Sequence, residues 1–310
     1  MNIITLTLSP AFDVHCRTGE LVLHKENHAT VTDRCAGGKG VNVSRAPAAF
    51  GIDSTAVTVL GKENHKPFEE EMERDGVSLL PVFTEGSIRE NLTVHTDDGR
   101  ETRISFGGAA VSASVFQEAQ DLLTRLCTDG SVLAVMGSIP DGVSVNAVKA
   151  MLRSLKAQGV RIVIDSRSFA LNDLIEVAPF LIKPNEQEIA AYMNVDADDM
   201  RAIRLAAEQL YRGGVENVMI SLGARGALLV SESGCHLAVA PTVSPLSTIG
   251  AGDSAVAGFL MGLSLGEDAV SCLRRAVALG SAACLTSGTR PPRKEDAESL
   301  LPRVTITPLE

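Results

Sequence analysis

The sequence contains no apolar run long enough to cross a bilayer, although 45% of its 310 residues are hydrophobic. Membrane-spanning helices need about 20 consecutive apolar residues. The chain opens on a short strand-like apolar run without a charged leader or a small-residue cleavage site. Export signals have both features. We therefore expect a cytoplasmic protein that does not act at a membrane.

Basic residues are too few for a nucleic-acid-binding protein. Lys and Arg total 28 against 38 Asp and Glu, which gives a formal net charge of −10 and a pI near 5.2. Nucleic-acid binding depends on clustered cations that neutralise phosphates. Small anionic ligands remain compatible with this charge if a few Lys and Arg residues gather beside a glycine-rich loop.

The cysteines lack the spacing of a disulfide framework or a zinc site. Six are scattered along the chain: Cys16, Cys35, Cys127, Cys235, Cys272 and Cys284. This distribution predicts reduced, mostly buried thiols and no structural metal.

Apolar segments alternate with amphipathic ones over most of the chain, which predicts a single α/β domain spanning residues 1–310. The pattern indicates a doubly wound, mainly parallel sheet flanked by helices, with a ligand crevice at the carboxyl ends of its strands. Strands are expected at residues 2–8, 54–60, 132–136, 161–165, 180–183 and 217–222, with a hairpin at the sheet edge at 226–231 and 235–240. Helices are expected at residues 64–74, 143–158, 171–177, 200–212 and 294–301.

A small second sheet is predicted from residues of about 12–35 and 88–107, where short alternating groups surround the hairpin signal Asp97-Asp-Gly99. Such a sheet could act as a lid over the crevice. Arg89 and Arg103 flank this hairpin, and a closed lid would bring their positive charge to an anionic substrate. Ordinary solvent-exposed arginines are the alternative.

A glycine-rich turn within residues 247–260 delivers one carboxylate, Asp253, to the start of an apolar helix. Gly250 and Gly252 free the backbone and let a ligand approach closely. The first amides of a helix lack intrahelical partners and attract phosphate together with the helix dipole. Asp253 could then take a proton from an alcohol that attacks the bound phosphoryl group. A helix N-cap after a tight turn is the alternative.

A second glycine-rich stretch, Ala36-Gly-Gly-Lys-Gly-Val-Asn42, leads into another helical segment. It lacks the spacing of the P-loop and of the dinucleotide-binding fingerprint. It therefore indicates either a phosphate-binding loop of another kind or close backbone packing. Pro47 is expected to kink the helix or mark a late start. Asp13 follows the first strand, where it could bind ligand hydroxyls or cap a loop.

Two further segments are candidates for a nucleotide site. Asn185 and Glu188 follow a predicted strand and could hold a metal-bound water beside a phosphate, because Mg²⁺ usually keeps several waters. Helix capping by Asn185 is the competing interpretation. Residues 267–286 carry small side chains, including Gly280. They could border a purine or simply pack tightly.

Four motifs occur in the order seen in the ribokinase-like (PfkB) carbohydrate kinases, and the resemblance runs from Thr5 to about Arg290. The four are Ala36-Gly-Gly-Lys-Gly-Val-Asn42, Lys183-Pro-Asn-Glu-Gln-Glu188, Ser221-Leu-Gly223 and Ser247-Thr-Ile-Gly-Ala-Gly-Asp253. Other segments resemble the sugar-phosphate branch, which holds 1-phosphofructokinases, tagatose-6-phosphate kinases and the minor 6-phosphofructokinase type. They are Ser9-Pro-Ala-Phe-Asp13, Arg89-Glu-Asn-Leu92, Gly137-Ser-Ile-Pro140 and Gly280-Ser-Ala-Ala283.

The resemblance implies a ribokinase-like fold with a β-sheet lid and assigns roles to individual residues. It makes Asp253 the catalytic base, and Gly250, Ala251 and Gly252 the anion hole, a phosphate site formed by backbone amides. For the sugar it implies Asp13, Gly38, Lys39 and Asn42, with Arg89 and Arg103 for the sugar's phosphate. For Mg²⁺-ATP it implies Lys183, Asn185, Glu188, Ser221, Gly223 and Gly280.

The implied activity is transfer of the γ-phosphoryl group of ATP to a ketohexose phosphate, with fructose 1-phosphate as the first choice and tagatose 6-phosphate or fructose 6-phosphate as alternatives. A kinase of an unphosphorylated sugar or nucleoside, and a non-catalytic sensor of sugar phosphate and nucleotide, also remain open. Ser9, Pro47 and Arg167 depart from the family's usual residues and leave the sugar undecided. Dimerisation through the lid is common in this branch.

Overall fold

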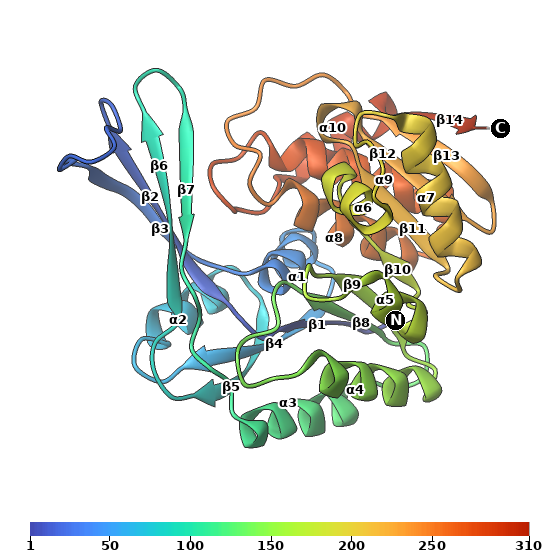
Figure 1. The fold of residues 1–310 in the computed structure, drawn as a ribbon, viewed down its shortest axis with the longest axis horizontal. Coiled ribbons are helices and arrows are strands. Elements are labelled where there is room, and N and C mark those ends of the chain that lie inside the picture. Colours follow the sequence, from blue (N-terminus) through green and yellow to red (C-terminus); the bar gives the residue numbers. More distant parts are fainter. Residues whose placement is uncertain (310) are drawn as a thin grey trace.

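The computed structural model describes residues 1–309, which form two β-sheets and the helices that cover them (Figure 1). The large sheet has the strand order β14-β13-β12-β11-β10-β9-β8-β1-β4-β5. All neighbours from β5 to β11 pair in parallel, and β11 to β14 pair antiparallel. Its strands are β1 (Ile3–Thr7), β4 (Ser54–Gly61), β5 (Ser78–Thr84), β8 (Val132–Met136), β9 (Arg161–Asp165), β10 (Leu181–Ile182), β11 (Asn217–Ser221), β12 (Ala227–Ser231), β13 (Gly234–Val239) and β14 (Thr305–Leu309).

Helices cover both faces of this sheet, so the predicted doubly wound α/β fold is confirmed. One apolar core joins the sheet to α3 (Ala113–Leu126), α4 (Val145–Ala157), α5 (Leu171–Val177), α6 (Glu186–Met193) and α7 (Met200–Arg212). A second core joins it to α1 (Lys39–Ala49), α8 (Ala251–Ser264) and α9 (Ala269–Ala283), with α10 (Lys294–Leu300) packed on α8 and α9. Because both faces are covered, the central strands β1 and β8 are buried along their whole length, and β8 is entirely apolar.

The small sheet stands apart from the large one as an arm on the left of Figure 1. It has the order β3-β2-β6-β7 and consists of β2 (Ala11–Thr18), β3 (Thr30–Gly37), β6 (Arg89–Thr96) and β7 (Glu101–Ser105). β2 follows β1, and β6 follows β5, so the arm rises from the carboxyl edge of the large sheet. β3 runs directly into α1, and α2 (Lys66–Arg74) packs beneath them.

Several details differ from the sequence predictions. The hairpin β12–β13 is not the sheet edge, because β14 pairs with β13. The late helix start at Pro47 is also wrong: α1 begins at Lys39 and runs through Pro47 to Ala49. All six cysteines are free thiols, and four of them are buried. Within residues 1–309 no helix has both the length and the apolar character that a membrane crossing requires.

Candidate active site

Asp253 lies in the first turn of α8 and is 8% exposed. The N-cap of α8 is Gly250, whose left-handed φ of 80° favours glycine, so the interpretation of Asp253 as the N-cap is wrong. The Asp253 carboxylate instead accepts a hydrogen bond of 2.8 Å from the Asn42 side chain of α1. Burial raises the pKa of Asp253 to about 6, and Lys39 opposes this shift. A carboxylate with such a pKa is well matched to accept a proton near neutral pH.

Two lysines and a second carboxylate lie near Asp253. Lys39 Nζ lies 2.7 Å from one oxygen of Asp165, and Lys183 Nζ lies 3.4 Å from the other. Burial alone would raise the pKa of Asp165, but Lys183 and Lys39 hold it below its usual value. Asp165 therefore stays charged and keeps both lysines, which reach it from α1 and from the end of β10, beside Asp253.

The start of α8 offers a place for phosphate. The first amides of a helix point outward without intrahelical acceptors, and their dipoles favour an anion. A side chain at Gly252 would lie 3.2 Å from Lys183 Nζ, so the lysine lies directly beside this backbone. The Ala251 amide already reaches the Thr248 carbonyl at 3.4 Å. The amides of Gly252 and Asp253 and the Lys183 ammonium group therefore provide donors at the predicted anion hole of Gly250, Ala251 and Gly252.

Asp13 lies across the site on β2 and is 4% exposed. It accepts hydrogen bonds from Asn91 at 2.9 Å and from Arg103 at 3.3 Å, which belong to β6 and β7. Because Asp13 is a strand residue with side-chain partners, the loop-capping interpretation is wrong. Sequence reasoning gave Asn91 no role of its own, although it belongs to the Arg89-Glu-Asn-Leu92 segment.

The side chains of Arg89 and Arg103 differ in their hydrogen-bond partners. Arg103 reaches Asp13 with a partly exposed side chain. Arg89 lies at the base of the small sheet and donates to the carbonyl oxygens of Phe106 at 2.8 Å and Ser9 at 3.4 Å. Burial lowers the pKa of Arg89, while Asp13 acts against this shift. Both side chains lie on the Asp13 side of the small sheet, as a role in binding an anion requires.

The glycines between β3 and α1 are needed for close packing. A side chain at Gly37 would collide with the Asp13 carboxylate, and one at Gly40 would collide with the Thr7 hydroxyl. Gly38 has a φ of 133° and caps α1. The packing interpretation is therefore confirmed for these glycines. The same loop also delivers Lys39 and Asn42 to the Asp253 cluster, so packing and positioning operate together.

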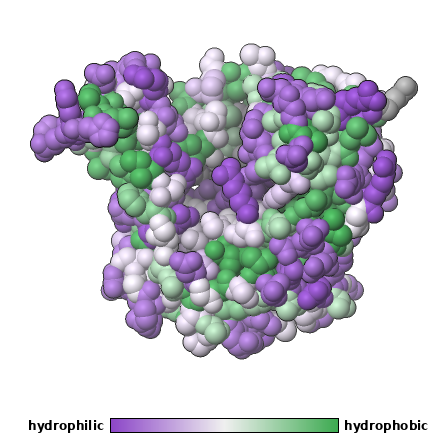
Figure 2. All heavy atoms as spheres, in the orientation of Figure 1, coloured by the Kyte–Doolittle hydropathy of each residue, from purple (hydrophilic) through white to green (hydrophobic). Residues whose placement is uncertain are grey.

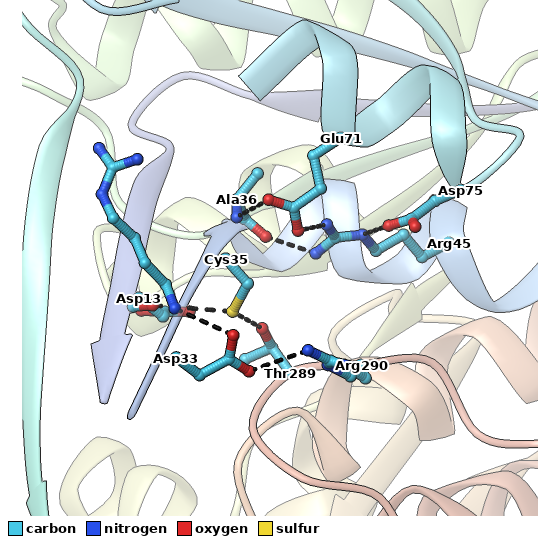
Figure 3. A network of polar contacts seen from close by, with 10 residues as sticks. Asp13, Asp33, Cys35, Ala36, Arg45, Glu71, Asp75, Thr289 and Arg290 are labelled. Atoms are coloured by element: carbon cyan, nitrogen blue, oxygen red, sulfur yellow. Dashed lines mark hydrogen bonds and ion pairs between the residues drawn. The ribbon is translucent and has the colours of Figure 1, made fainter. Parts of the chain in front are cut away.

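The small sheet also touches the segment after α9 (Figure 3). The Cys35 thiol lies between the Asp13 carbonyl oxygen, at 3.7 Å, and the Thr289 hydroxyl, at 3.4 Å. Arg290 pairs with Asp33 at 3.2 Å. These contacts join the small sheet to the C-terminal half. Figure 2 shows the molecule hollowed between these two parts.

Asn185 and Glu188 form a capping box at the start of α6. Asn185 Oδ1 accepts the Glu188 amide at 2.8 Å, and Glu188 Oε2 accepts the Asn185 amide at 2.9 Å. The capping interpretation is therefore confirmed. The second carboxylate oxygen of Glu188 lies 2.5 Å from Nε of Arg167, one of the residues that depart from the family pattern. Within the described chain no three His, Cys, Asp or Glu side chains form a metal-binding group.

The remaining nucleotide candidates lie along the same edge of the large sheet. Ser221 ends β11 and bridges to Asn185. Gly223 follows with a φ of 56°, in a turn with open space around it. A side chain at Gly280 would lie 3.1 Å from the Ala251 carbonyl oxygen, so Gly280 lets α9 approach the start of α8. Its nucleotide role remains a prediction beside this packing role.

A buried carboxylate at a helix start, lysines beside backbone amides, and a second polar group on the small sheet fit a phosphotransferase that acts on an alcohol. Residues 13–296 match the pfkB family carbohydrate kinases. The chain belongs to this family, and it is an ATP-dependent carbohydrate kinase.

Similar proteins span nearly the whole chain. The 1-phosphofructokinase of Escherichia coli (strain K12) is 33% identical over 308 residues, which cover 99% of this chain and 98% of that enzyme. The ATP-dependent 6-phosphofructokinase isozyme 2 of the same organism is 30% identical over 303 residues, covering 97% and 98%. The crystal structure of Escherichia coli phosphofructokinase-2 with substrates and products superimposes with a TM-score of 0.91 at 29% identity, covering 98% of this chain and 99% of that one.

Proposed function

We propose that the protein transfers the γ-phosphoryl group of ATP to a hydroxyl of a ketohexose phosphate, with fructose 1-phosphate giving fructose 1,6-bisphosphate as the first choice. The observation that carries this proposal is the loop of residues 37–42, which packs at Gly37 against the Asp13 carboxylate and reaches Asp253, whose pKa is raised to about 6, through Asn42. The relative with the name 1-phosphofructokinase supports this choice of sugar. Tagatose 6-phosphate and fructose 6-phosphate are the alternatives.

Asp253 accepts the proton of the attacking hydroxyl in this mechanism. Lys183 and the amides of Gly252 and Asp253 stabilise the charge that develops on the transferring group. Lys39 reaches Asp165 from α1, as Lys183 does from the end of β10, so Asp165 holds both lysines in place. The step is an in-line displacement, so positioning and electrostatics supply most of the rate enhancement.

The sugar phosphate binds on the small-sheet side. Asn42 Oδ1 is buried and has no hydrogen-bond partner among residues 1–309, so it is available to a sugar hydroxyl. Asp13 supplies a carboxylate for a second hydroxyl. Arg103 and Arg89 supply cations for the phosphate, which a planar guanidinium can bind through two parallel hydrogen bonds. We assign Gly38 and Lys39 to the same half of the site.

The nucleotide binds along α6, β11 and α8, near Lys183, Asn185, Ser221, Gly223 and Gly280. These residues fit a Mg²⁺ ion that is carried by phosphates and held through water, rather than one enclosed by protein. Glu188 is the main candidate for holding a water bound to Mg²⁺. Its oxygen that faces Arg167 has only this arginine as a partner, and the Arg167 side chain is 78% exposed. Asn185 keeps a second lone pair. A bound Mg²⁺ would neutralise phosphate charge.

The small sheet is the proposed lid, formed by about residues 12–35 and 88–107 of a single domain. Its contacts through Cys35 and Asp33 to the segment after α9 support closure over the site. Closure would exclude water and limit hydrolysis of ATP. We also propose a homodimer through the lid, and action in the cytoplasm, where the free thiols would stay reduced.

A panel of acceptors assayed for ADP release tests the function. The panel contains fructose 1-phosphate, fructose 6-phosphate, tagatose 6-phosphate, fructose and a nucleoside. We expect the highest kcat/KM with fructose 1-phosphate, and we expect Arg103→Met to lower kcat/KM for phosphorylated acceptors only. Faster turnover of fructose or the nucleoside would refute the phosphate requirement. Binding of sugar phosphate and nucleotide without ADP release would indicate a sensor.

A further inference from the structure

One cation of α1 is buried below the glycine-rich loop. The Arg45 side chain is 2% exposed and pairs with two carboxylates, Glu71 in α2 and Asp75 at its C-cap (Figure 3). Its Nε donates to Asp75 at 2.7 Å, and one Nη donates to Glu71. The other Nη donates to the backbone carbonyl oxygen of Ala36. A buried charge is costly unless it is paired, and the Arg45 guanidinium is paired with two carboxylates.

Glu71 also hydrogen-bonds to the backbone of Ala36. Its second carboxylate oxygen accepts the Ala36 amide at 2.8 Å. Side chains of α1 and α2 therefore hold both the N–H and the C=O of Ala36. β3 is an edge strand of the small sheet, so its outward peptide groups have no neighbouring strand to pair with. Arg45 and Glu71 take the place of that strand at one position.

Ala36 lies immediately before the glycine-rich loop of the proposed site. Gly37 abuts the Asp13 carboxylate, and Gly38 caps α1 in a conformation that favours glycine. The first turn of α1 then sends Lys39 to Asp165 and Asn42 to Asp253. A shift of the Ala36 peptide would consequently move groups on both sides of the proposed sugar position.

We propose that Arg45 and Glu71 are positioning residues that fix the glycine-rich loop for the sugar phosphate. Apolar side chains could join α1 to α2 equally well, and often at lower cost than buried ions. Only an acceptor and a donor together can hold both polar groups of one residue. The inference rests on the proposed function, because it assigns the loop to the sugar side of the site.

Glu71→Gln and Asp75→Asn form a matched pair for the test. Each neutralises one of the two carboxylates that pair with the Arg45 guanidinium, but only Glu71 contacts Ala36. Both neighbours of the Glu71 carboxylate are donors, so a glutamine NH₂ group must face one of them. We expect Glu71→Gln to lower kcat/KM for the sugar phosphate by about 10- to 100-fold, the scale of a misplacement near 1 Å, and to leave KM for ATP within about twofold. Asp75→Asn should leave both values within about twofold.

A purely structural role predicts a different result. The two variants would then lose thermal stability while both KM values stayed unchanged, or would lose activity alike, and either result overturns the proposal. If Glu71→Gln fails to fold, Glu71→Asp provides the second test. It keeps the charge but retracts the carboxylate from Ala36, and it should reproduce the loss in kcat/KM. Wild-type kinetics in Glu71→Asp would refute the inference.

Hydrogen exchange separates this proposal from the proposed function. In Glu71→Gln the amides of residues 36–40 should exchange faster than in the wild type, whereas Asp75→Asn should preserve their protection. This readout needs no turnover. Unchanged exchange in Glu71→Gln would refute the positioning role even if the protein phosphorylates fructose 1-phosphate. Faster exchange without turnover of any acceptor would preserve the loop restraint and refute the kinase substrate instead.

Discussion

The carboxylate of Asp253 is enclosed by protein, and this burial raises its pKa to about 6 in spite of Lys39 and Lys183 nearby. Protonation below that pH removes the lone pair that a general base needs. The neighbouring Asp165 behaves in the opposite way, because Lys183 and Lys39 keep its pKa low despite burial. Two buried carboxylates in one site are thus suited to different tasks: in the proposed mechanism Asp253 accepts a proton, while Asp165 stays charged and pairs with the two lysines.

This difference predicts the acid limb of the pH profile. Because the raised pKa belongs to the base, kcat/KM for the sugar phosphate should fall about tenfold per pH unit below about pH 6. Steady-state kinetics between pH 5 and 8 measure the limb. The phosphate of the substrate also titrates near this range, so calorimetric binding of the same sugar phosphate to Asp253→Asn serves as the control. A profile that stays flat down to pH 5 after this correction would rule out Asp253 as the titrating base.

At the level of elements, α9 packs closely on α8, whose start is the proposed phosphate site. Gly258 in α8 faces the backbone of Arg275 and Ala276, and Gly280 in α9 faces the Ala251 carbonyl oxygen. Gly258 lies in the middle of the contact, whereas Gly280 lies at the start of α8, beside the proposed anion hole. A substitution at Gly258 should therefore affect the packing of the two helices, whereas one at Gly280 should affect the proposed anion hole.

Alanine at each glycine tests this separation. Gly258→Ala should lower stability by about 1–3 kcal/mol through overpacking and leave KM for ATP unchanged. Gly280→Ala should raise KM for ATP several-fold, because its methyl group displaces the first turn of α8. Thermal unfolding and initial rates measure the two effects. An unchanged KM in Gly280→Ala, or an equal rise in both variants, would contradict the account.

Elements with strong periodicity or continuous apolar runs could be predicted to the residue, as for β8, β9, α5 and α7. The edge strands β5 and β14 were missed because Pro81 and Pro308 interrupt them. Proline is tolerated there since an edge strand leaves one side unpaired. α3 was also missed, although Phe116, Ala119 and Leu123 follow a helical spacing that could have revealed it.

The motif residues of the site were predictable, but their contacts were not. Asn42 contacts Asp253 across 211 residues of sequence. Arg45 and Glu71, which bind the backbone of Ala36, are 9 and 35 positions away from it. No local pattern encodes such pairings, because they depend on how β3, α1 and α2 pack. Excluding Asp253 as the N-cap likewise required the backbone angle of Gly250, which three small residues in sequence leave open.

For the molecule as a whole, the small sheet has two unlike faces. Asp13 and Arg103 point to the site, while the other face carries Val14, Leu92 and Ile104, which are neighbours on adjacent strands. Ile104 is 43% exposed. Figure 2 shows hydrophobic side chains on this arm among hydrophilic ones. A second copy of the sheet would cover this face and protect its edges.

Charge on that face should therefore prevent the proposed dimer. We expect Ile104→Glu to convert a dimer to a monomer in sedimentation equilibrium, with a lower affinity for sugar phosphate because the lid loses its support. Leu205→Glu is the control, since Leu205 is 49% exposed on α7, outside the small sheet. A monomeric wild type, or an Ile104→Glu variant that remains dimeric, would show that the lid is not the interface.

The central claim is that Asp253 accepts the proton of the attacking hydroxyl, and Asp253→Asn tests this claim most directly. Asparagine keeps an acceptor for Asn42 and removes a buried charge, so the variant should unfold at no lower temperature than the wild type at pH 7.5. Loss of a positioned base typically costs about 10²- to 10⁴-fold in rate. The measurement is kcat for ADP formation from fructose 1-phosphate, with calorimetry of sugar phosphate and nucleotide binding alongside. A loss of that size with both ligands still bound is the predicted result, and wild-type turnover by the folded variant would contradict the account.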